Sequence, residues 1–351
     1  MVDPVERLNT AMVTHFSESC EWTGVRDTDR AGWLALRREL FTASDVAAIM
    51  GEDPRRDAFD VYVSKVTAPP PAEKLALNDP RLWGKALELT IAHTVADYHG
   101  WEIQDGGYLL RSRKHPQIGA TLDAEVRRSE SEGWLPYEGK TSRMPRDWSE
   151  SDGSLPTHIL IQAQVQLLVT GAPCNIVFAL LFGSQPVMVP VYPYPEFHSI
   201  LAEQVEWMAD LVTRGEPPTV TARSADSLRR LYPNDNSSTV PLPIEAIEWT
   251  REVQQIAAHV TELDARKDML RNQLRLAIGP ATYGELPEPV GGKGAWKWGV
   301  NSAGSRSLLA VKAAPGASSG SNLLDAPVQM HALPEADLIS KYRTTRRTAR
   351  R

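Results

Sequence analysis

The chain has 351 residues and a mass of 38.8 kDa, with 42% hydrophobic and 23% charged residues. This length exceeds one typical domain of about 100–200 residues, so we expect two domains or one large domain with appendages. The composition excludes collagen-like and wholly disordered proteins. The sequence contains no run of about 18 apolar residues, so it predicts no membrane-spanning helix. Residues 1–30 lack the basic end and apolar stretch of a secretory signal, so we expect a cytoplasmic protein, in the host cell if a phage encodes it.

The two cysteines and the net charge limit the kinds of site that the chain can build. Cys20 and Cys174 are far apart and belong to no Cys/His cluster, so neither a disulfide framework nor a zinc site is predicted, and any metal is expected to have oxygen ligands. The net charge of −6 argues only weakly against a nucleic-acid partner, because basic clusters can gather on one face of a folded chain. Any one cluster alone is more typical of a solvated surface than of a nucleic-acid contact; the clusters lie at residues 37–38, 55–56, 111–114 and 143–146.

Helical and extended patterns alternate up to residue 215, which we assign as one domain, residues 1–215. Cap, proline and glycine signals predict helices, in chain order, at 33–37, 43–50, 80–99, 157–170 and 196–214. Short apolar runs between turn residues predict strands at 107–110, 118–126, 134–140, 176–182 and 187–192. This order predicts an α/β fold with a central mixed sheet flanked by helices.

The remaining chain is predicted to contain a linker, a second unit and a tail. Residues 216–243 hold five prolines and are predicted to be a linker. Within 244–312 we expect a long helix and a small β hairpin formed by 296–300 and 306–311. The helix repeats seam positions at spacings of three and four, which fits packing on a partner helix or on its own domain equally well; they are Val253, Ile256, Val260, Leu263, Lys267, Leu270, Leu274 and Ala277. Residues 313–351 are expected to be a disordered basic tail that contacts nucleic acid weakly.

The most informative chemical pattern is Asp123 followed by Glu138-Gly139-Lys140. Two carboxylates from adjacent strands can converge on a hard divalent cation, and the Gly139 carbonyl can add a ligand. Lys140 lies two residues from Glu138, on the same face of a strand, where its ammonium can orient water and stabilise charge on an attacked phosphodiester. Alone, this pattern is also typical of a surface salt bridge.

Four further segments accompany this pattern in a fixed order. Trp33 and Arg37 precede the run 42–44, and residues 83–85 precede Glu88. The run 163–166 precedes Thr170-Gly171. Over residues 30–215 the whole set resembles the phage lambda exonuclease family, or YqaJ-type viral recombinases, within the PD-(D/E)XK nucleases.

The resemblance implies a role for each matching residue. Asp123 and Glu138, joined by the Gly139 carbonyl, would bind Mg²⁺, for which Mn²⁺ would substitute. Lys140, the helix-borne acid Glu88 and Gln164 would form the catalytic group. The 5′ phosphate of a DNA end would be held by Arg37 and Ser44, with Thr121 where the family often has serine. Gly139 departs from the apolar residue frequent in the family; a backbone ligand survives this change, but the strand is less rigid.

The resemblance also implies an activity and partners. We expect a magnesium-dependent exonuclease that digests the 5′-ended strand of linear double-stranded DNA. The 3′ single strand would pass to a single-strand annealing protein, and a ring-shaped homotrimer would surround the DNA. Two rivals stay open: a structure-specific or restriction-like endonuclease on the same core, and a DNA-end-binding module without catalysis. The presence of Asp123, Glu138 and Lys140 together favours an enzyme.

Overall fold

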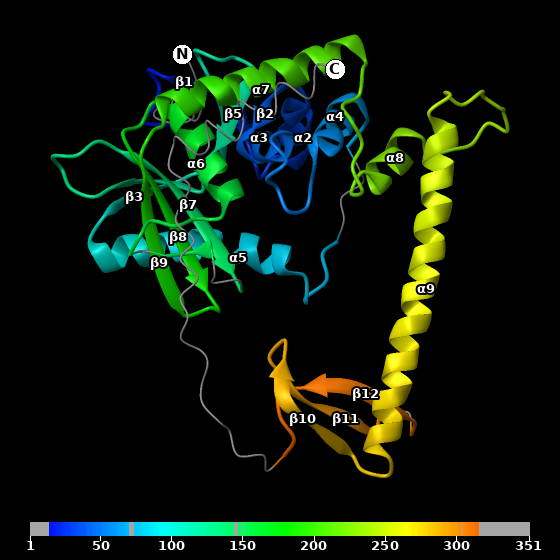
Figure 1. Ribbon diagram of the computed structural model, residues 1–351. Coiled ribbons are helices and arrows are strands. Elements are labelled where there is room, and N and C mark those ends of the chain that lie inside the picture. The colour runs from blue at the N-terminus through cyan, green and yellow to red at the C-terminus, as the bar shows by residue number, and fades with distance from the viewer. Residues whose placement is uncertain (1–13, 70–73, 144–146, 150, 303, 316–351) are drawn as a thin grey trace, which may run out of the picture. The chain divides into compact units, whose positions relative to one another are not determined.

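The computed structural model describes residues 14–69, 74–143, 147–149, 151–302 and 304–315 (Figure 1). The described chain divides between Asn234 and Asp235 into an N-terminal unit and a C-terminal unit. Most of the predicted basic tail, from residue 316 onward, lies outside the described residues. None of the helices in the described ranges combines the length and apolar character needed to cross a bilayer.

The N-terminal unit is a mixed α/β structure. Its helices are α2 (Arg30–Glu39), α3 (Ala43–Ile49), α4 (Ala58–Val66), α5 (Pro80–His99), α6 (Thr157–Thr170), α7 (Pro195–Arg214) and α8 (Ala225–Leu231). Its strands are β1 (Cys20–Arg26), β2 (Phe41–Thr42), β3 (Glu102–Asp105), β4 (Tyr108–Ser112), β5 (Ile118–Thr121), β6 (Ala124–Arg127), β7 (Leu135–Ser142), β8 (Asn175–Leu181) and β9 (Gln185–Val191).

Two mixed sheets form the framework of this unit. The larger has the order β3-β6-β7-β8-β9, with β7 and β8 parallel and the other neighbours antiparallel. The smaller has the order β1-β4-β5-β2, with β2 and β5 parallel. The chain passes from the smaller to the larger sheet between β5 and β6, so the predicted single run 118–126 is two strands in different sheets. This crossing contains Asp123.

Helices cover both faces of the larger sheet, with α5 on one face and α6 on the other (Figure 1). The alternation of side chains along β8 shows this directly, since successive residues of a strand point to opposite faces. Ile176 and Phe178 pack in a core with Ile91 and Val95 of α5. Val177 belongs to the second, larger core, which also contains residues of α3, α4, α6 and α7.

Local signals set the helix boundaries closely. Pro80 opens α5 after its cap Asp79, and Gly100 closes it in the left-handed conformation with φ 69°. Gly171 ends α6 in the same way, so the predicted bounds of both helices are confirmed. A glycine adopts this backbone conformation without the steric cost that a Cβ would add.

Part of the predicted linker 216–243 is folded onto the N-terminal unit. Ser224 and Ser227, both buried, donate hydrogen bonds to Asp57 (2.8 Å) and Asp60 (2.5 Å) at the start of α4. These bonds hold α8 against α4. Proline and polar content alone did not indicate this short helix.

The C-terminal unit consists of one long helix, α9 (Ala246–Ile278), followed by three strands. The strands β10 (Tyr283–Val290), β11 (Lys293–Val300) and β12 (Arg306–Val311) form an antiparallel sheet in that order. The predicted hairpin is therefore two strands of a three-stranded sheet. The strand β10 was missed because prolines interrupt its pattern, and its edge position tolerates them.

Candidate active site

Asp123 lies in the two-residue bend between β5 and β6, where the chain changes sheets. The register of the larger sheet places it beside the centre of β7, because Ala124 pairs with Tyr137. Its Oδ2 accepts a hydrogen bond from the Gly139 backbone N–H at 2.8 Å. The backbone therefore fixes the Asp123 carboxylate next to the Glu138-Gly139-Lys140 run.

Glu138 and Lys140 lie on one face of β7, as their spacing predicts. Glu138 is 5% exposed and forms an ion pair through Oε1 with the Lys140 ammonium. Burial alone would lower the pKa of Lys140, but the charges of Glu138 and Asp123 and the hydrogen bond to Glu138 raise it above its ordinary value. Lys140 in this arrangement is a fully protonated ammonium.

Glu88 reaches the same place from α5. It hydrogen-bonds to Asp123, and its Oε2 accepts a hydrogen bond from the Lys85 ammonium at 2.5 Å. Lys85 also pairs with Asp27, at 2.6 Å. Burial pushes the pKa of Glu88 up, but the bonds from Asp123 and Lys85 hold it below its ordinary value. The run 83–88 thus contributes its acid to the cluster, as the pattern indicates.

Asp123 is the carboxylate of this cluster whose pKa is raised most clearly. Burial and the neighbouring charge of Glu138 raise its pKa well above the ordinary range, although Lys140 opposes this. Carboxylates held this close repel each other, so one of them retains a proton unless a cation is present. Such a set of oxygen ligands has the chemistry that Mg²⁺ or Mn²⁺ prefers.

The carboxylate oxygens of this cluster are the donor type that a hard cation prefers, but their spacing is not that of a complete metal site. No three Asp, Glu, His or Cys side chains of the described ranges converge closely enough to form a complete metal site. Glu138 is paired with Lys140, and Glu88 with Lys85. Gly139 packs closely beside these groups, since an added Cβ would be in van der Waals contact with Tyr137 at 3.4 Å and with the Asp123 carboxylate at 3.8 Å.

Gln166, which sequence reasoning did not select, is the glutamine that contacts the carboxylates. Its Nε2 donates to Glu138 Oε2 at 2.6 Å, and its Oε1 accepts from Asn175 Nδ2 at 2.5 Å. Gln164, the predicted residue, instead bonds to the Tyr192 carbonyl (2.7 Å) and to His198 (2.8 Å), so the structure does not bring it to the cluster. Two residues along a helix turn a side chain by about 200°, so only one of the two can face β7.

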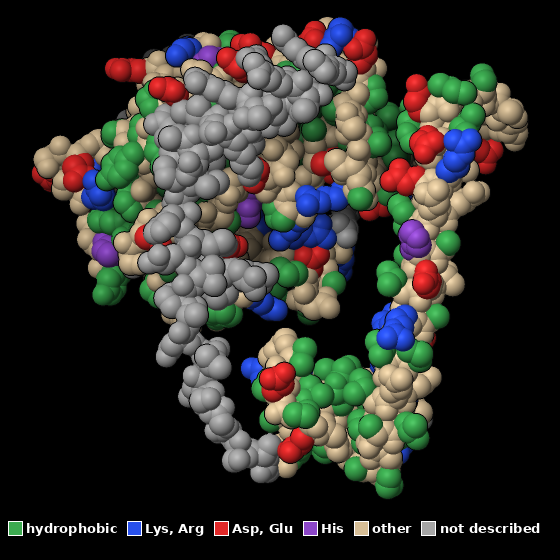
Figure 2. Space-filling model, viewed as in Figure 1, with side chains coloured by type: hydrophobic (Ala, Val, Ile, Leu, Met, Phe, Trp, Pro, Cys, Tyr) green, Lys and Arg blue, Asp and Glu red, His purple; other side chains and the backbone are tan. Residues whose placement is uncertain are grey.

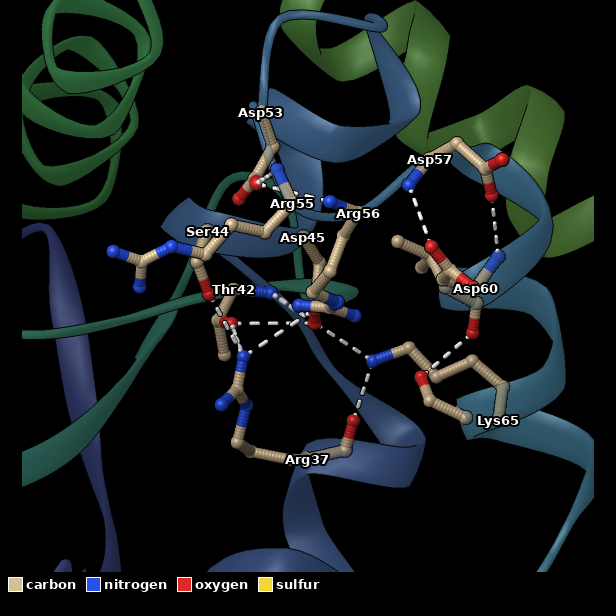
Figure 3. A network of polar contacts seen from close by, with 12 residues as sticks. Arg37, Thr42, Ser44, Asp45, Asp53, Arg55, Arg56, Asp57, Asp60 and Lys65 are labelled. Carbon is tan, nitrogen blue, oxygen red and sulfur yellow. Dashed lines mark hydrogen bonds and ion pairs between the residues drawn. The ribbon is translucent and has the colours of Figure 1, made fainter. Parts of the chain in front are cut away.

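A second polar cluster surrounds Arg37 and Ser44, as predicted (Figure 3). Arg37 Nη2 donates to Ser44 Oγ at 2.9 Å and to Thr42 Oγ1 at 2.6 Å. Its guanidinium also stacks on the ring of Trp33, 4.6 Å from the centroid. The sequence pattern from Trp33 to Ser44 is therefore one contiguous structure built by α2, β2 and α3.

Asp45 is the centre of this cluster. It is 2% exposed and contacts three cations: Lys65 at 2.9 Å, Arg56 at 3.0 Å and Arg37 at 3.3 Å. Burial would raise the pKa of Asp45, but these three charges hold it well below its ordinary value. Burial lowers the pKa of Arg37 and of Lys65, and Asp45 opposes this. Three cations therefore contact one carboxylate directly, and Asp53 and Asp60 add negative charge near Arg56.

Thr121 stands apart from this cluster. Its hydroxyl is buried and has no hydrogen-bond partner among the described residues. Its carbonyl accepts a weak bond from Gln166 Nε2 at 3.3 Å. Thr121 thus lies on the side of the carboxylate cluster, whereas Arg37 donates to Thr42, Ser44 and Asp45.

The two clusters lie on a common support. Helix α6 packs on α3, which carries Ser44 and Asp45, and on β7, which carries Glu138 and Lys140. His158 in the first turn of α6 is within electrostatic range of both, because burial and the charges of Lys140 and Arg55 lower its pKa while Asp53 raises it. Helix α6 therefore contacts the elements that carry both clusters.

The residues that form both clusters lie in a stretch that matches a known family model. Residues 32–173 match the family model of the YqaJ-like viral recombinase domain. Over this stretch the chain is similar to YqaJ-like viral recombinase domains. The matched stretch contains Arg37, Ser44, both glutamines and all members of the carboxylate cluster.

Individual relatives are more distant. The YqaJ protein of Bacillus subtilis strain 168, which is described as uncharacterized, is 22% identical over 264 residues, covering 74% of this chain and 81% of that protein. An alkaline exonuclease from Laribacter hongkongensis has 17% identity and a TM-score of 0.39 over 53% of this chain and 93% of its own. Its complex with dAMP gives a TM-score of 0.40, with coverage of 58% and 98%.

Proposed function

We propose that the chain is a divalent-metal-dependent nuclease that digests linear double-stranded DNA from its ends. The observation that carries this proposal is the pairing of Lys140 with the buried Glu138, beside Asp123 and Glu88, in a stretch similar to YqaJ-like domains. A core of the PD-(D/E)XK type, digestion from the 5′ end and transfer of the 3′ strand to an annealing protein belong to the same proposal.

The carboxylates would hold the cation, which we propose to be Mg²⁺, and Mn²⁺ would substitute. Asp123 and Glu138 are the first ligands, with the Gly139 carbonyl beside them. When bound, such an ion polarises the phosphodiester and lowers the pKa of an attacking water. Gln166 keeps Glu138 oriented from the buried side.

Lys140 supplies positive charge on the solvent side of the cluster. Its side chain is 27% exposed, so the ammonium reaches both Glu138 and a DNA backbone placed against β7. A protonated lysine here orients a water through its hydrogen bonds and stabilises charge that builds on the attacked phosphate. A general-base role is disfavoured, because the neighbouring carboxylates raise its pKa.

The pocket around Arg37 would hold the terminal 5′ phosphate. A guanidinium fork and the Ser44 hydroxyl suit phosphate oxygens, and the positive charges of Arg56 and Lys65 lie close to them. Because α6 contacts both α3, which carries Ser44, and β7, which carries the carboxylates, a strand whose end is held at Arg37 would present a phosphodiester to the carboxylate cluster.

The test is digestion of linear and covalently closed circular duplex DNA, each with Mg²⁺ or EDTA. The proposal expects loss of the linear form alone, and only with metal. Nicking of circles would favour an endonuclease, and binding of ends without digestion would favour a non-catalytic module. Lys140→Ala protein purified in parallel controls for contaminating nucleases, and Lys293→Ala, at an exposed lysine of β11, is the matched variant that retains activity.

A further inference from the structure

The turn between β8 and β9 holds a bulky side chain in a backbone conformation that such side chains rarely adopt. Phe182 has a φ of 51° and is 55% exposed. Among the residues that the structure describes, Ser237 is the only other non-glycine residue with positive φ. For a bulky residue this conformation is an outlier that the surrounding structure must enforce, and such strain gathers at functional sites. Phe182 therefore indicates a function of this turn that the nuclease proposal does not yet use.

The type of turn makes phenylalanine an unusual residue at this position. The Ser184 N–H donates to the Leu181 carbonyl at 3.1 Å, and both residues between them, Phe182 and Gly183, have positive φ. This is the pattern of a type I′ turn, whose central positions favour asparagine, aspartate and glycine. The loop residues are exposed, and a Cβ added to Gly183 would meet no atom within 4 Å. Neither the turn type nor burial accounts for the aromatic ring.

The turn lies beside the carboxylate cluster. Strand β8 runs parallel to β7 and pairs Ala179 with Lys140 and Leu181 with Ser142. The Phe182 N–H continues this pairing, since it donates to the Ser142 carbonyl at 2.9 Å. At about 3.3 Å per residue and about 4.8 Å between neighbouring strands, the Cα atoms of Phe182 and Lys140 are about 11 Å apart. That distance is roughly three nucleotides of a duplex strand, which rises about 3.4 Å per nucleotide.

An exposed aromatic ring among cations is the combination that binds unpaired nucleobases. Arg143, which is also exposed, directly follows Ser142 and so lies beside the turn. Figure 2 shows further Lys and Arg side chains gathered on the face of the N-terminal unit between α3 and α5. An aromatic ring can stack on the face of any base, while cations hold the phosphates, but bases inside a duplex already stack on their neighbours.

We propose that Phe182 stacks on one unpaired nucleobase of the DNA end, within about three nucleotides of the phosphodiester at the carboxylate cluster. The proposal rests on the proposed nuclease function, and it makes Phe182 a substrate-binding residue. The strain at Phe182 is then the cost in stability of presenting an aromatic ring at the tip of a tight turn.

The first test separates the ring from the turn by Phe182→Asn. Asparagine tolerates positive φ, so the urea midpoint of this variant should equal or exceed that of wild type. Its affinity for a duplex with a short frayed end, measured in Ca²⁺, should fall about five- to a hundredfold, as expected for loss of one stacked base. Phe182→Tyr keeps a ring and should bind as wild type does. Tyr98→Asn removes an 85% exposed ring from the last turn of α5 and is the matched control that should also keep wild-type affinity.

The second test identifies the base. A single abasic nucleotide is moved through the first four positions of each frayed strand. At the stacking position it should weaken binding to wild type as much as Phe182→Asn does, and it should have no further effect in Phe182→Asn, because the contact is already lost. Additive effects at every position overturn the proposal. A lower urea midpoint or a changed mass in solution for Phe182→Asn also overturns it, because the ring then packs in its own chain or against another copy.

Binding in Ca²⁺ needs no cleavage, so the two proposals can fail separately. Coupling between Phe182 and one base, without digestion of linear DNA in Mg²⁺, would support the stacking contact and overturn the nuclease. Digestion without such coupling would support the nuclease and overturn the stacking contact.

Discussion

Replacing Gln166 by leucine tests whether its contact with Glu138 contributes to cleavage. The sequence predicted Gln164 as a catalytic residue, but in the structure it is Gln166 that contacts Glu138. Leucine has nearly the same size and helix preference as glutamine but cannot donate to Glu138 or accept from Asn175. Gln164→Leu, two residues earlier on the same buried helix, is the matched control.

The expected loss of cleavage rate follows from the hydrogen bond that Gln166 donates to the Glu138 carboxylate. A hydrogen bond to a carboxylate contributes about 1.5–3 kcal/mol, so an equal loss of transition-state stabilisation lowers the cleavage rate about ten- to a hundredfold. Gln164→Leu should leave the rate within about threefold of wild type, because its bonds reach only α7 and the segment before it. Both variants lose stability, since each leaves buried polar groups without partners.

The assay is initial digestion of a linear duplex in Mg²⁺, with urea unfolding of each variant measured under the same conditions. Rates are compared at a temperature where every variant is folded, so that unfolding does not imitate a catalytic loss. Equal rate losses for Gln164→Leu and Gln166→Leu, or a wild-type rate for Gln166→Leu, would refute the reasoning.

Three further predictions concern the lysine, the phosphate pocket and pH. Lys140→Ala should lower the cleavage rate about a hundredfold or more, while isothermal titration finds Mg²⁺ affinity nearly unchanged; an equal loss of both would make Lys140 structural. Wild type should prefer 5′-phosphorylated to 5′-hydroxyl duplex ends, and Arg37→Ala should erase most of that preference while changing digestion of hydroxyl ends little; salt should weaken the preference, and slowing of both substrates alike would contradict end recognition. Burial lowers the pKa of His198 to about 4, and Lys114 and His115 add to the shift. Between about pH 4 and 6.5, His198 is therefore neutral in the folded chain but protonated in the unfolded chain. Stability should therefore be lost as pH falls through this window, by up to about 3 kcal/mol, and urea unfolding of His198→Gln should show a flatter pH dependence; an unchanged slope would remove His198 as its cause.

The sequence predicted those parts of the fold that local chemistry decides. Pro80 and Gly100 bound α5, and Gly171 ends α6, because fixed φ and left-handed backbone act within one turn. The run 118–126 was predicted as one strand, because its apolar character continues through the bend at Asp123. Only pairing with two different sheets reveals that bend.

The residues of the candidate site likewise divide into those that the sequence predicted and those that only the structure revealed. Asp123, Glu138 and Lys140 were found because adjacent strands with a fixed side-chain period bring such residues together. Gln166 was missed because α6 is buried on nearly all sides, so no apolar stripe indicates which face meets β7. Arg56 and Lys65 join Asp45 from outside the motif, and such contacts depend on how α4 packs, which no local pattern specifies.

The central claim is that the cluster at β7 is a metal-dependent catalytic centre, and one measurement addresses it directly. Asp123→Ala and Glu138→Ala are compared with wild type for digestion of linear duplex in Mg²⁺ and for binding of the same duplex in Ca²⁺. The account predicts that both variants lose digestion while DNA-end binding in Ca²⁺ largely persists, because the carboxylates hold the ion and the pocket around Arg37 holds the end. Near-normal digestion by either variant would contradict it.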